Sequence, residues 1–233
     1  MLDRSRLVTV VGPGGVGKTR LALVAAAEAV QNYPDGVWIV ELSGLSDPAL
    51  LPNTVASVLG LPGQDARSAL GTVLEYLRDK QLLLILDTCE HLLDPCAELI
   101  QAVLTHAPAV AFLATSRQPL DTPGEQNFAI QPLPVPDADA VELGRGDAVE
   151  LLALRAAAAV PGFAVTSDNS ADVIRLCRRL DGMPLAIELA AVQLRALALR
   201  RGHGLLALRL LADLGAAQRG RILAGQGARA VPR

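Results

Sequence analysis

The strongest chemical signal in the sequence is the stretch from residue 12 to residue 19, which follows the pattern G-x-x-x-x-G-K-T. Glycines in such a loop leave successive backbone N–H groups free to point inward at phosphate oxygens. Lys18 would add a positive charge for the β- and γ-phosphates, and the Thr19 hydroxyl would be a ligand for Mg²⁺. We therefore expect a nucleoside triphosphate or diphosphate to bind here, in contact with Gly12, Gly14, Gly15, Val16, Gly17, Lys18, Thr19 and Arg20.

The segments on either side of this loop are those that a phosphate site requires. An apolar, β-branched run from Leu7 to Val11 predicts a strand before the loop, and an Ala/Leu-rich run from Leu21 to Val30 predicts a helix that opens at about Gly17. The positive end of that helix would face the same anion as the loop amides. The alternative is a glycine-rich turn that contains a lysine by chance.

An acidic residue follows a second apolar run, Leu82–Leu86. Asp87 would lie at the carboxyl end of a buried strand beside the loop, where a carboxylate can hold Mg²⁺ directly or through water. The alternative is an ordinary turn residue that ends a strand. Glu90 could orient or deprotonate an attacking water, or it could be a surface acid at the start of a loop. At most it indicates weak catalysis.

An arginine follows a further apolar run, Val110–Ala114. In a parallel sheet the ends of adjacent strands meet at the crevice where phosphate lies, so Arg117 could reach a γ-phosphate. It would then distinguish a triphosphate from a diphosphate. A lone arginine in a strand-end loop is more often solvated or ion-paired. The succession of loop, Asp and Arg after three buried strands favours the sensing role.

Strand-like and helix-like segments alternate through residues 1–136, which predicts βαβ units and a parallel five-stranded sheet between helices. This part is the expected P-loop nucleotide-binding domain, and the proline-rich segment 132–136 is its linker. N-caps are expected at Asp47 and Asp94, each followed by a proline. The remaining expected strands are Val37–Leu42 and a weaker Phe128–Ile130, and the remaining expected helices are 47–59, 66–78 and 94–106.

The pattern after the linker is helical, and residues 137–199 are the expected small helical lid domain. One helix is predicted over 147–159. A second would be capped by Ser167 or Asp168 and run to about Leu180, and a third would cover 185–199 with Pro184 in its first turn. Residues 200–233 form an Arg/Gly-rich tail whose pattern supports no particular element.

The net charge of −3 is unevenly distributed. Residues 195–233 contain eight Arg and one Asp, so the rest of the chain holds 13 basic and 23 acidic residues. An acidic body gives no support for broad nucleic-acid binding, and the basic end favours a solvated segment over a DNA contact. We therefore expect no direct DNA binding by this chain.

Three cysteines, Cys89, Cys96 and Cys177, are odd in number and lack C-x-x-C spacing. This pattern favours buried free thiols in a reducing compartment over disulfides or a zinc site. No apolar run reaches the length of a membrane span, and no cleavable signal precedes the first strand. We expect a cytoplasmic protein without membrane contact.

Four motifs, taken in order, resemble those of the NB-ARC-like signal-transduction (STAND) ATPases. More narrowly, they resemble the ATPase module of large bacterial transcriptional regulators with LuxR-type or SARP-type DNA-binding domains. The resemblance covers about residues 6–198. The motifs are Gly12 to Arg20, Leu86-Asp87-Thr88-Cys89-Glu90-His91, Ala114-Thr115-Ser116-Arg117 and Gly182-Met183-Pro184-Leu185-Ala186.

The resemblance implies a helical lid in which Pro184 contacts the adenine and sugar. It also implies a switch, in which ADP holds a resting form and ATP opens it for assembly or DNA binding by a larger regulator. The expected partners are thus the nucleotide, other domains of such a regulator, or a second copy of the chain.

The sequence departs from the family pattern in three respects. It has no Gly-Arg-Glu motif before the phosphate loop, and it carries Thr88 where relatives often have Asn or Asp. No continuation toward a winged-helix domain is recognisable after about Leu199. We therefore expect slow hydrolysis at most, in a module that belongs to or derives from a larger regulator. The alternatives are a turnover ATPase or kinase, and a remnant that no longer binds nucleotide well.

Overall fold

The computed structural model describes residues 2, 4–62, 66–136 and 146–201. The chain divides into two compact units, the first ending at Gln131 and the second beginning at Pro132. This division falls before the proline-rich segment 132–136, which the sequence assigns to the end of the first domain. The expected tail lies, from residue 202 onward, outside the described residues.

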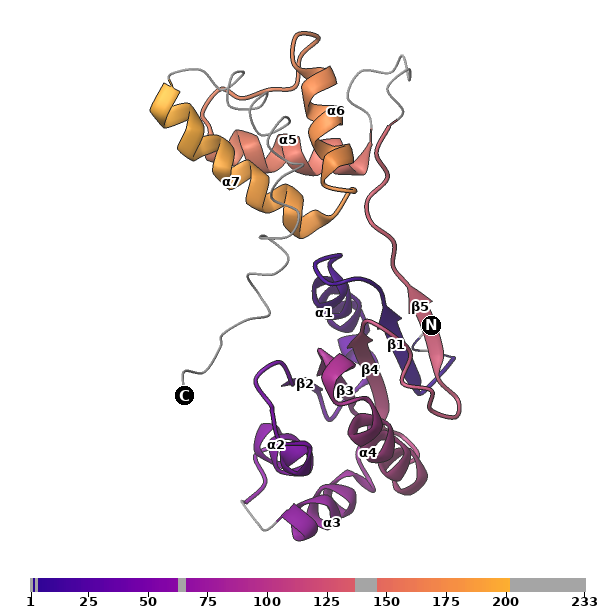
Figure 1. Ribbon diagram of the computed structural model, residues 1–233. Coiled ribbons are helices and arrows are strands. Elements are labelled where there is room, and N and C mark those ends of the chain that lie inside the picture. Colours follow the sequence, from indigo (N-terminus) through magenta and orange to yellow (C-terminus); the bar gives the residue numbers. More distant parts are fainter. Residues whose placement is uncertain (1, 3, 63–65, 137–145, 202–233) are drawn as a thin grey trace, which may run out of the picture. The chain divides into compact units, whose positions relative to one another are not determined.

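The first unit is built on one five-stranded parallel sheet with the strand order β2-β3-β4-β1-β5 (Figure 1). The predicted parallel five-stranded sheet is confirmed. β4 extends beyond its apolar run to include Thr115 and Ser116, and β5 begins at Gln126 instead of Phe128. The strands are β1 (Leu7–Val11), β2 (Val37–Glu41), β3 (Leu83–Asp87), β4 (Ala111–Ser116) and β5 (Gln126–Ala129).

Helices cover both faces of this sheet. On one face Ala22 of α1 packs with Val10 of β1, and on the other Val73 of α3 and Ile100 of α4 pack around Phe112 of β4. Because β1, β3 and β4 are covered on both faces, their sequences are continuous apolar runs without alternation. The helices are α1 (Lys18–Ala29), α2 (Leu51–Val58), α3 (Ala66–Leu77) and α4 (Leu93–His106), with short 3₁₀ turns η1 (Val30–Asn32), η2 (Pro48–Leu50) and η3 (Cys89–His91).

One of the two predicted N-caps in this unit is correct. The Asp47 carboxylate accepts a hydrogen bond from the Ala49 N–H at 3.0 Å, and Pro48 begins η2. The cap at Asp94 is wrong, because the cap position of α4 is Leu92 and Asp94 lies inside the first turn. The helix starts early because η3 leads straight into it. The Asp94 charge still favours the positive end of the helix.

The second unit consists of three described helices around their own apolar core: α5 (Asp147–Ala159), α6 (Ser170–Arg179) and α7 (Pro184–Arg201). A salt bridge joins α5 to α7, with the Arg155 Nη2 atom 2.8 Å from Glu188 Oε1. The predicted cap of α6 is wrong, since Asn169 holds the cap position. Its side chain accepts from the Thr166 N–H and donates to the Ala164 carbonyl, which fixes the preceding loop instead.

The turn between α6 and α7 is held tightly against the linker segment 132–136. The Leu133 N–H donates to the Gly182 carbonyl at 2.9 Å, and the Arg178 guanidinium donates twice to the Pro136 carbonyl. Gly182 has φ +65°, and a Cβ atom there would lie 2.1 Å from the Leu133 carbonyl oxygen. Only glycine permits this close approach, so the motif glycine has a structural role in addition to ending α6.

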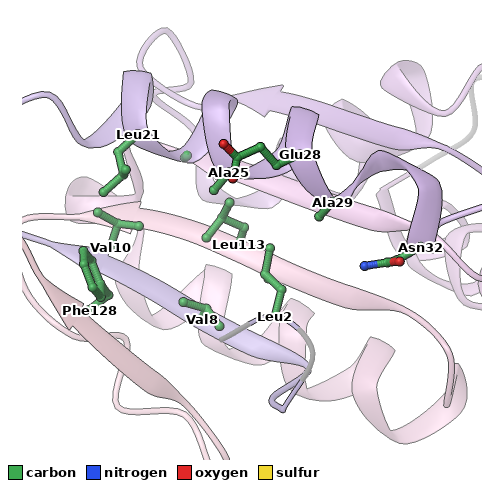
Figure 2. A pocket seen from close by; sticks show the side chains of 11 residues that line it. Leu2, Val8, Val10, Leu21, Ala25, Glu28, Ala29, Asn32, Leu113 and Phe128 are labelled. Atoms are coloured by element: carbon green, nitrogen blue, oxygen red, sulfur yellow. The ribbon is translucent and has the colours of Figure 1, made fainter.

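Figure 2 shows a cavity of about 350 Å³ beneath α1, against β1, β4 and β5. Its lining is apolar except for Glu28 and Asn32. No residue of the stretch 12–19 lines it, so this cavity is distinct from the candidate phosphate site.

Candidate functional site

The loop after β1 has the backbone shape that its glycines predict. Gly17 occupies the N-cap position of α1 with φ +102°, and the helix begins where the Leu21 N–H donates to the Gly17 carbonyl. A Cβ atom at Gly12 would lie 2.7 Å from the carbonyl oxygen of Ile130, the residue that follows β5. Only glycine therefore permits this close approach of the loop to Ile130. The Gly12 N–H donates to the Ser116 carbonyl, which ties the loop to the end of β4.

Lys18 is buried in the first turn of α1, with its ammonium turned back onto the loop. Nζ donates to the carbonyls of Gly12 at 3.0 Å and Pro13 at 3.1 Å. Burial lowers the pKa of Lys18; Arg117 lowers it further, while the carboxylates of Glu90 and Asp87 raise it. The ammonium therefore lies within electrostatic reach of all three charged groups that the sequence nominated.

Asp87 lies at the centre of a network of hydroxyl groups. Its Oδ1 atom accepts from Thr19 Oγ1 at 2.7 Å and from Thr115 Oγ1 at 2.6 Å. The Thr115 hydroxyl in turn accepts from the Thr88 N–H at 2.9 Å, which holds Thr88 at a left-handed φ of +70°. A hydroxyl in contact with a carboxylate oxygen is the pair of protein oxygens that the Mg²⁺ of a phosphate loop takes, so these residues fit the ion.

Glu90 and Arg117 form an ion pair at the mouth of the loop. Arg117 Nε donates to Glu90 Oε1 at 2.9 Å. The guanidinium also reaches over the loop, since a Cβ atom on Gly14 would lie 3.3 Å from Arg117 Nη2. The structure thus brings Lys18, Thr19, Asp87, Glu90 and Arg117 together at one edge of the sheet.

The nucleotide contacts of Arg20 and Pro184 stay predictions, and the sequence gives no role for one further residue, Thr115. Arg20 is exposed on the first turn of α1. Pro184 is the first residue of α7, in the second unit, so its contact with a nucleotide stays a prediction. Thr115 belongs to the motif at residues 114–117, but the sequence alone predicts no role for it. The signal that could have found it is a hydroxyl at the end of a buried apolar strand that pairs with the strand carrying Asp87.

Within the described part of the chain, no group of three or more His, Cys, Asp or Glu side chains could hold a metal ion. This agrees with a phosphate-loop Mg²⁺ site, where the protein supplies one or two oxygens and the phosphates and water supply the rest. None of the described helices is long and apolar enough to cross a membrane. All three cysteines are buried and free, as predicted.

Comparison with known proteins identifies the first unit. A family model described as an AAA domain matches residues 2–118, which carry the loop, Asp87, Glu90 and Arg117. A Mycobacterium tuberculosis protein named as a candidate HTH-type transcriptional regulator is 40% identical over 197 residues, which are 84% of this chain and 21% of that protein. The regulatory protein AfsR of Streptomyces griseus is 34% identical over 116 residues, 46% of this chain and 11% of AfsR. The chain spans about a fifth of the length of the first of these relatives.

Solved structures share the fold at low sequence identity. The Aeropyrum pernix ORC2 protein has a TM-score of 0.55 and 13% identity, covering 89% of this chain and 61% of that one. Thermotoga maritima RuvB has a TM-score of 0.54 and 14% identity, with 89% and 62% covered.

These neighbours share the fold, and the family match includes the phosphate loop and the charged groups around it. Nucleotide binding is what this family implies. The chain belongs to the AAA family of P-loop ATPase domains and is similar to the corresponding module of bacterial transcriptional regulators.

Proposed function

We propose that this chain is a nucleotide switch module, which binds ATP and ADP with Mg²⁺ and hydrolyses ATP slowly at most. The observation that carries this proposal is the convergence of three groups at the carboxyl edge of the sheet. These are the buried ammonium of Lys18, the contact between the Thr19 hydroxyl and the Asp87 carboxylate, and the Arg117 guanidinium over Gly14.

Each group has one role in this proposal. The loop amides and Lys18 bind the phosphates, and Lys18 exchanges its two carbonyl partners for phosphate oxygens. Thr19 and Asp87 hold Mg²⁺, which offsets phosphate charge when bound. Arg117 follows β4, which lies between the strands that carry the loop and Asp87, so it is placed to contact a γ-phosphate.

Slow hydrolysis is supported by the state of the only nominated base. Glu90 Oε1 already accepts a hydrogen bond from Arg117, so this oxygen is engaged in an ion pair and not with an attacking water. A regulatory role is supported by the relatives, one named as an HTH-type transcriptional regulator and the other as a regulatory protein, whose chains are several times longer than this one. In that setting Pro184 would contact the nucleotide, and other domains or a second copy would respond.

The proposal is tested by calorimetric titration of the chain with ADP and ATP in the presence of Mg²⁺, alongside a steady-state phosphate-release assay. We expect binding of both nucleotides and turnover slower than about one per minute, against roughly 10 s⁻¹ for a typical enzyme. Fast turnover would indicate an ATPase or kinase instead, and absence of binding would indicate a remnant.

The lysine variants sharpen this test. Lys18→Ala removes the ammonium from the loop and should abolish binding of both nucleotides. Lys80→Ala is the matched control, because Lys80 is the chain's other lysine and pairs with Asp35 instead. It should leave both affinities unchanged, and a loss equal to that of Lys18→Ala would contradict the assignment.

A further inference from the structure

The Glu90–Arg117 ion pair occupies the place where a γ-phosphate would need a cation. Arg117 Nε donates to Glu90 Oε1 at 2.9 Å, and the same guanidinium lies over the loop at Gly14. Arg117 cannot give its Nε–H both to this carboxylate and to a phosphate oxygen. The carboxylate and a terminal phosphate therefore compete for this N–H donor and for the charge of one guanidinium, although its Nη atoms keep further N–H donors.

The backbone on both sides of the pair is fixed. Glu90 lies in η3, directly after Thr88, whose N–H is held by the Thr115 hydroxyl of β4. Arg117 directly follows β4, which pairs with β3 through Leu86 and Ala114. The two side chains thus project from neighbouring strand ends that cannot move apart without breaking the sheet.

The second oxygen of the Glu90 carboxylate is not used by the ion pair. The side chain is 20% exposed, and its Oε2 atom is buried with no hydrogen-bond partner among the described residues. The Glu90 charge also raises the pKa of Lys18, so it is felt at the ammonium that holds the phosphates. A terminal phosphate bound here would meet this negative charge.

We propose that Glu90 is a specificity-determining residue that disfavours triphosphate relative to diphosphate by holding Arg117 and by repelling the terminal charge. This inference rests on the proposed nucleotide switch and adds the element that keeps it in the ADP state. A γ-phosphate at Arg117 must share the charge of the guanidinium with Glu90, and it places a further negative charge beside the carboxylate. ADP has no γ-phosphate and does not require Arg117 to move.

The expected effect is modest because Arg117 is largely exposed. Its side chain is 66% accessible, and ion pairs of this kind contribute little individually. Replacing Glu90 should therefore raise the affinity for a triphosphate relative to ADP by roughly three- to tenfold. The ratio of the affinities for the triphosphate and for ADP is the relevant readout. Any change in the pKa of Lys18 caused by loss of the Glu90 charge would alter both affinities together.

The test compares ADP with the non-hydrolysable analogue AMP-PNP, both with Mg²⁺, by calorimetry on the full chain. The analogue removes hydrolysis, so loss of a catalytic base cannot imitate the effect. Glu90→Gln deletes the charge, and Glu98→Gln, on an exposed residue of α4, is the control with the same change in net charge. Glu90→Asp keeps the charge but withdraws the carboxylate from Arg117 by one methylene. It replaces Glu90→Gln as the test variant if Glu90→Gln lowers the melting temperature.

We expect Glu90→Gln, but not Glu98→Gln, to shift the ratio toward AMP-PNP, and to shift it less when Arg117→Ala is also present. An unchanged ratio would overturn the inference and leave the switch function standing. An equal shift with and without Arg117 would show repulsion alone and refute competition for the arginine. Absence of ADP and AMP-PNP binding by the unmodified chain would refute the proposed function and this inference together.

Discussion

One oxygen atom, Asp87 Oδ1, accepts hydrogen bonds from hydroxyls on two different elements, Thr19 on α1 and Thr115 on β4. Thr115 also accepts the Thr88 N–H and so holds the strained turn after β3. The hydroxyl of Thr115 is buried, and both of its hydrogen bonds remain inside the protein. It therefore positions the carboxylate, although a nucleotide or Mg²⁺ would be bound by other residues.

Replacement of Thr115 by Val keeps the shape of the side chain and removes both hydrogen bonds. We expect a loss of about 1 kcal/mol or more in the free energy of unfolding, because the half-buried Thr88 N–H loses its acceptor. The affinity for Mg²⁺–ADP should fall by roughly 10-fold or more, as for other residues that orient a metal ligand. Denaturant titration and calorimetry at several Mg²⁺ concentrations measure the two effects. Thr105→Val, on an exposed position of α4, is the control; an unchanged Mg²⁺ dependence in Thr115→Val would refute the positioning role.

The lowered pKa of Lys18 predicts a pH dependence of binding. Only the ammonium form binds phosphate, and burial holds its pKa below the ordinary value of 10.5. Affinity for ADP should therefore begin to fall at a lower pH than for an exposed lysine, by about tenfold per pH unit above the pKa. Glu90 raises this pKa, so Glu90→Gln should move the fall to still lower pH. Calorimetry from neutral to alkaline pH measures the profile, and a fall that begins no earlier than expected for the ordinary pKa of 10.5 would contradict the lowered pKa of Lys18.

At the scale of elements, the α6–α7 turn depends on Gly182. Alanine there combines a left-handed φ with a Cβ atom 2.1 Å from the Leu133 carbonyl oxygen. Gly162 has a similar φ of +79° but open space around its Cα. We expect Gly162→Ala to cost about 1–2 kcal/mol and Gly182→Ala clearly more, since backbone must move as well. Denaturant titration followed by far-UV circular dichroism compares the free energies of unfolding of the two variants. Equal losses of stability would show that the close approach of Gly182 to Leu133 is not needed.

The apolar runs in the sequence predict the strands because residues covered on both faces leave little choice of pattern. Helix ends are less determined. At α4 a 3₁₀ turn precedes the helix, and at α6 the cap position falls on Asn169, one residue after Asp168, although the Asn169 side chain bonds to the preceding loop. Local propensity does not decide between such neighbours, because a shift of one or two residues changes only a few hydrogen bonds.

The sequence also predicts which groups gather at the site but not how they pair. Lys18, Thr19, Asp87, Glu90 and Arg117 follow from the motifs, because each comes after or within a predicted strand end. The contact of Thr115 with Asp87 and that of Glu90 with Arg117 depend on the register between β3 and β4. Register is a property of the assembled sheet and cannot be read from either strand alone.

For the whole molecule, the three buried thiols report on opening of the fold. Burial raises the pKa of Cys177 to about 12, and a hydrogen bond with Cys96 together with burial raises that of Cys89. At about pH 8 Cys89 and Cys177 are therefore thiols, and all three cysteines are buried, so a thiol reagent should label them only through unfolding. ADP with Mg²⁺ should slow labelling further, because it binds the folded state alone. Labelling of the native chain at the rate of a free thiol would contradict the buried placement.

The phosphate loop follows the first strand of the chain, yet β1 pairs only with strands made much later. Thr9 lies opposite Ala114 on one side and Asn127 on the other. During synthesis the loop residues therefore leave the ribosome well before β4 and β5, the strands with which β1 pairs. Pairing of strands so distant in sequence is slow. The sheet around the phosphate loop is complete only after β5, which ends at Ala129, has been synthesised. Nucleotide in the cell would then bind only chains in which this sheet is complete, and so would stabilise the folded state relative to incompletely folded chains.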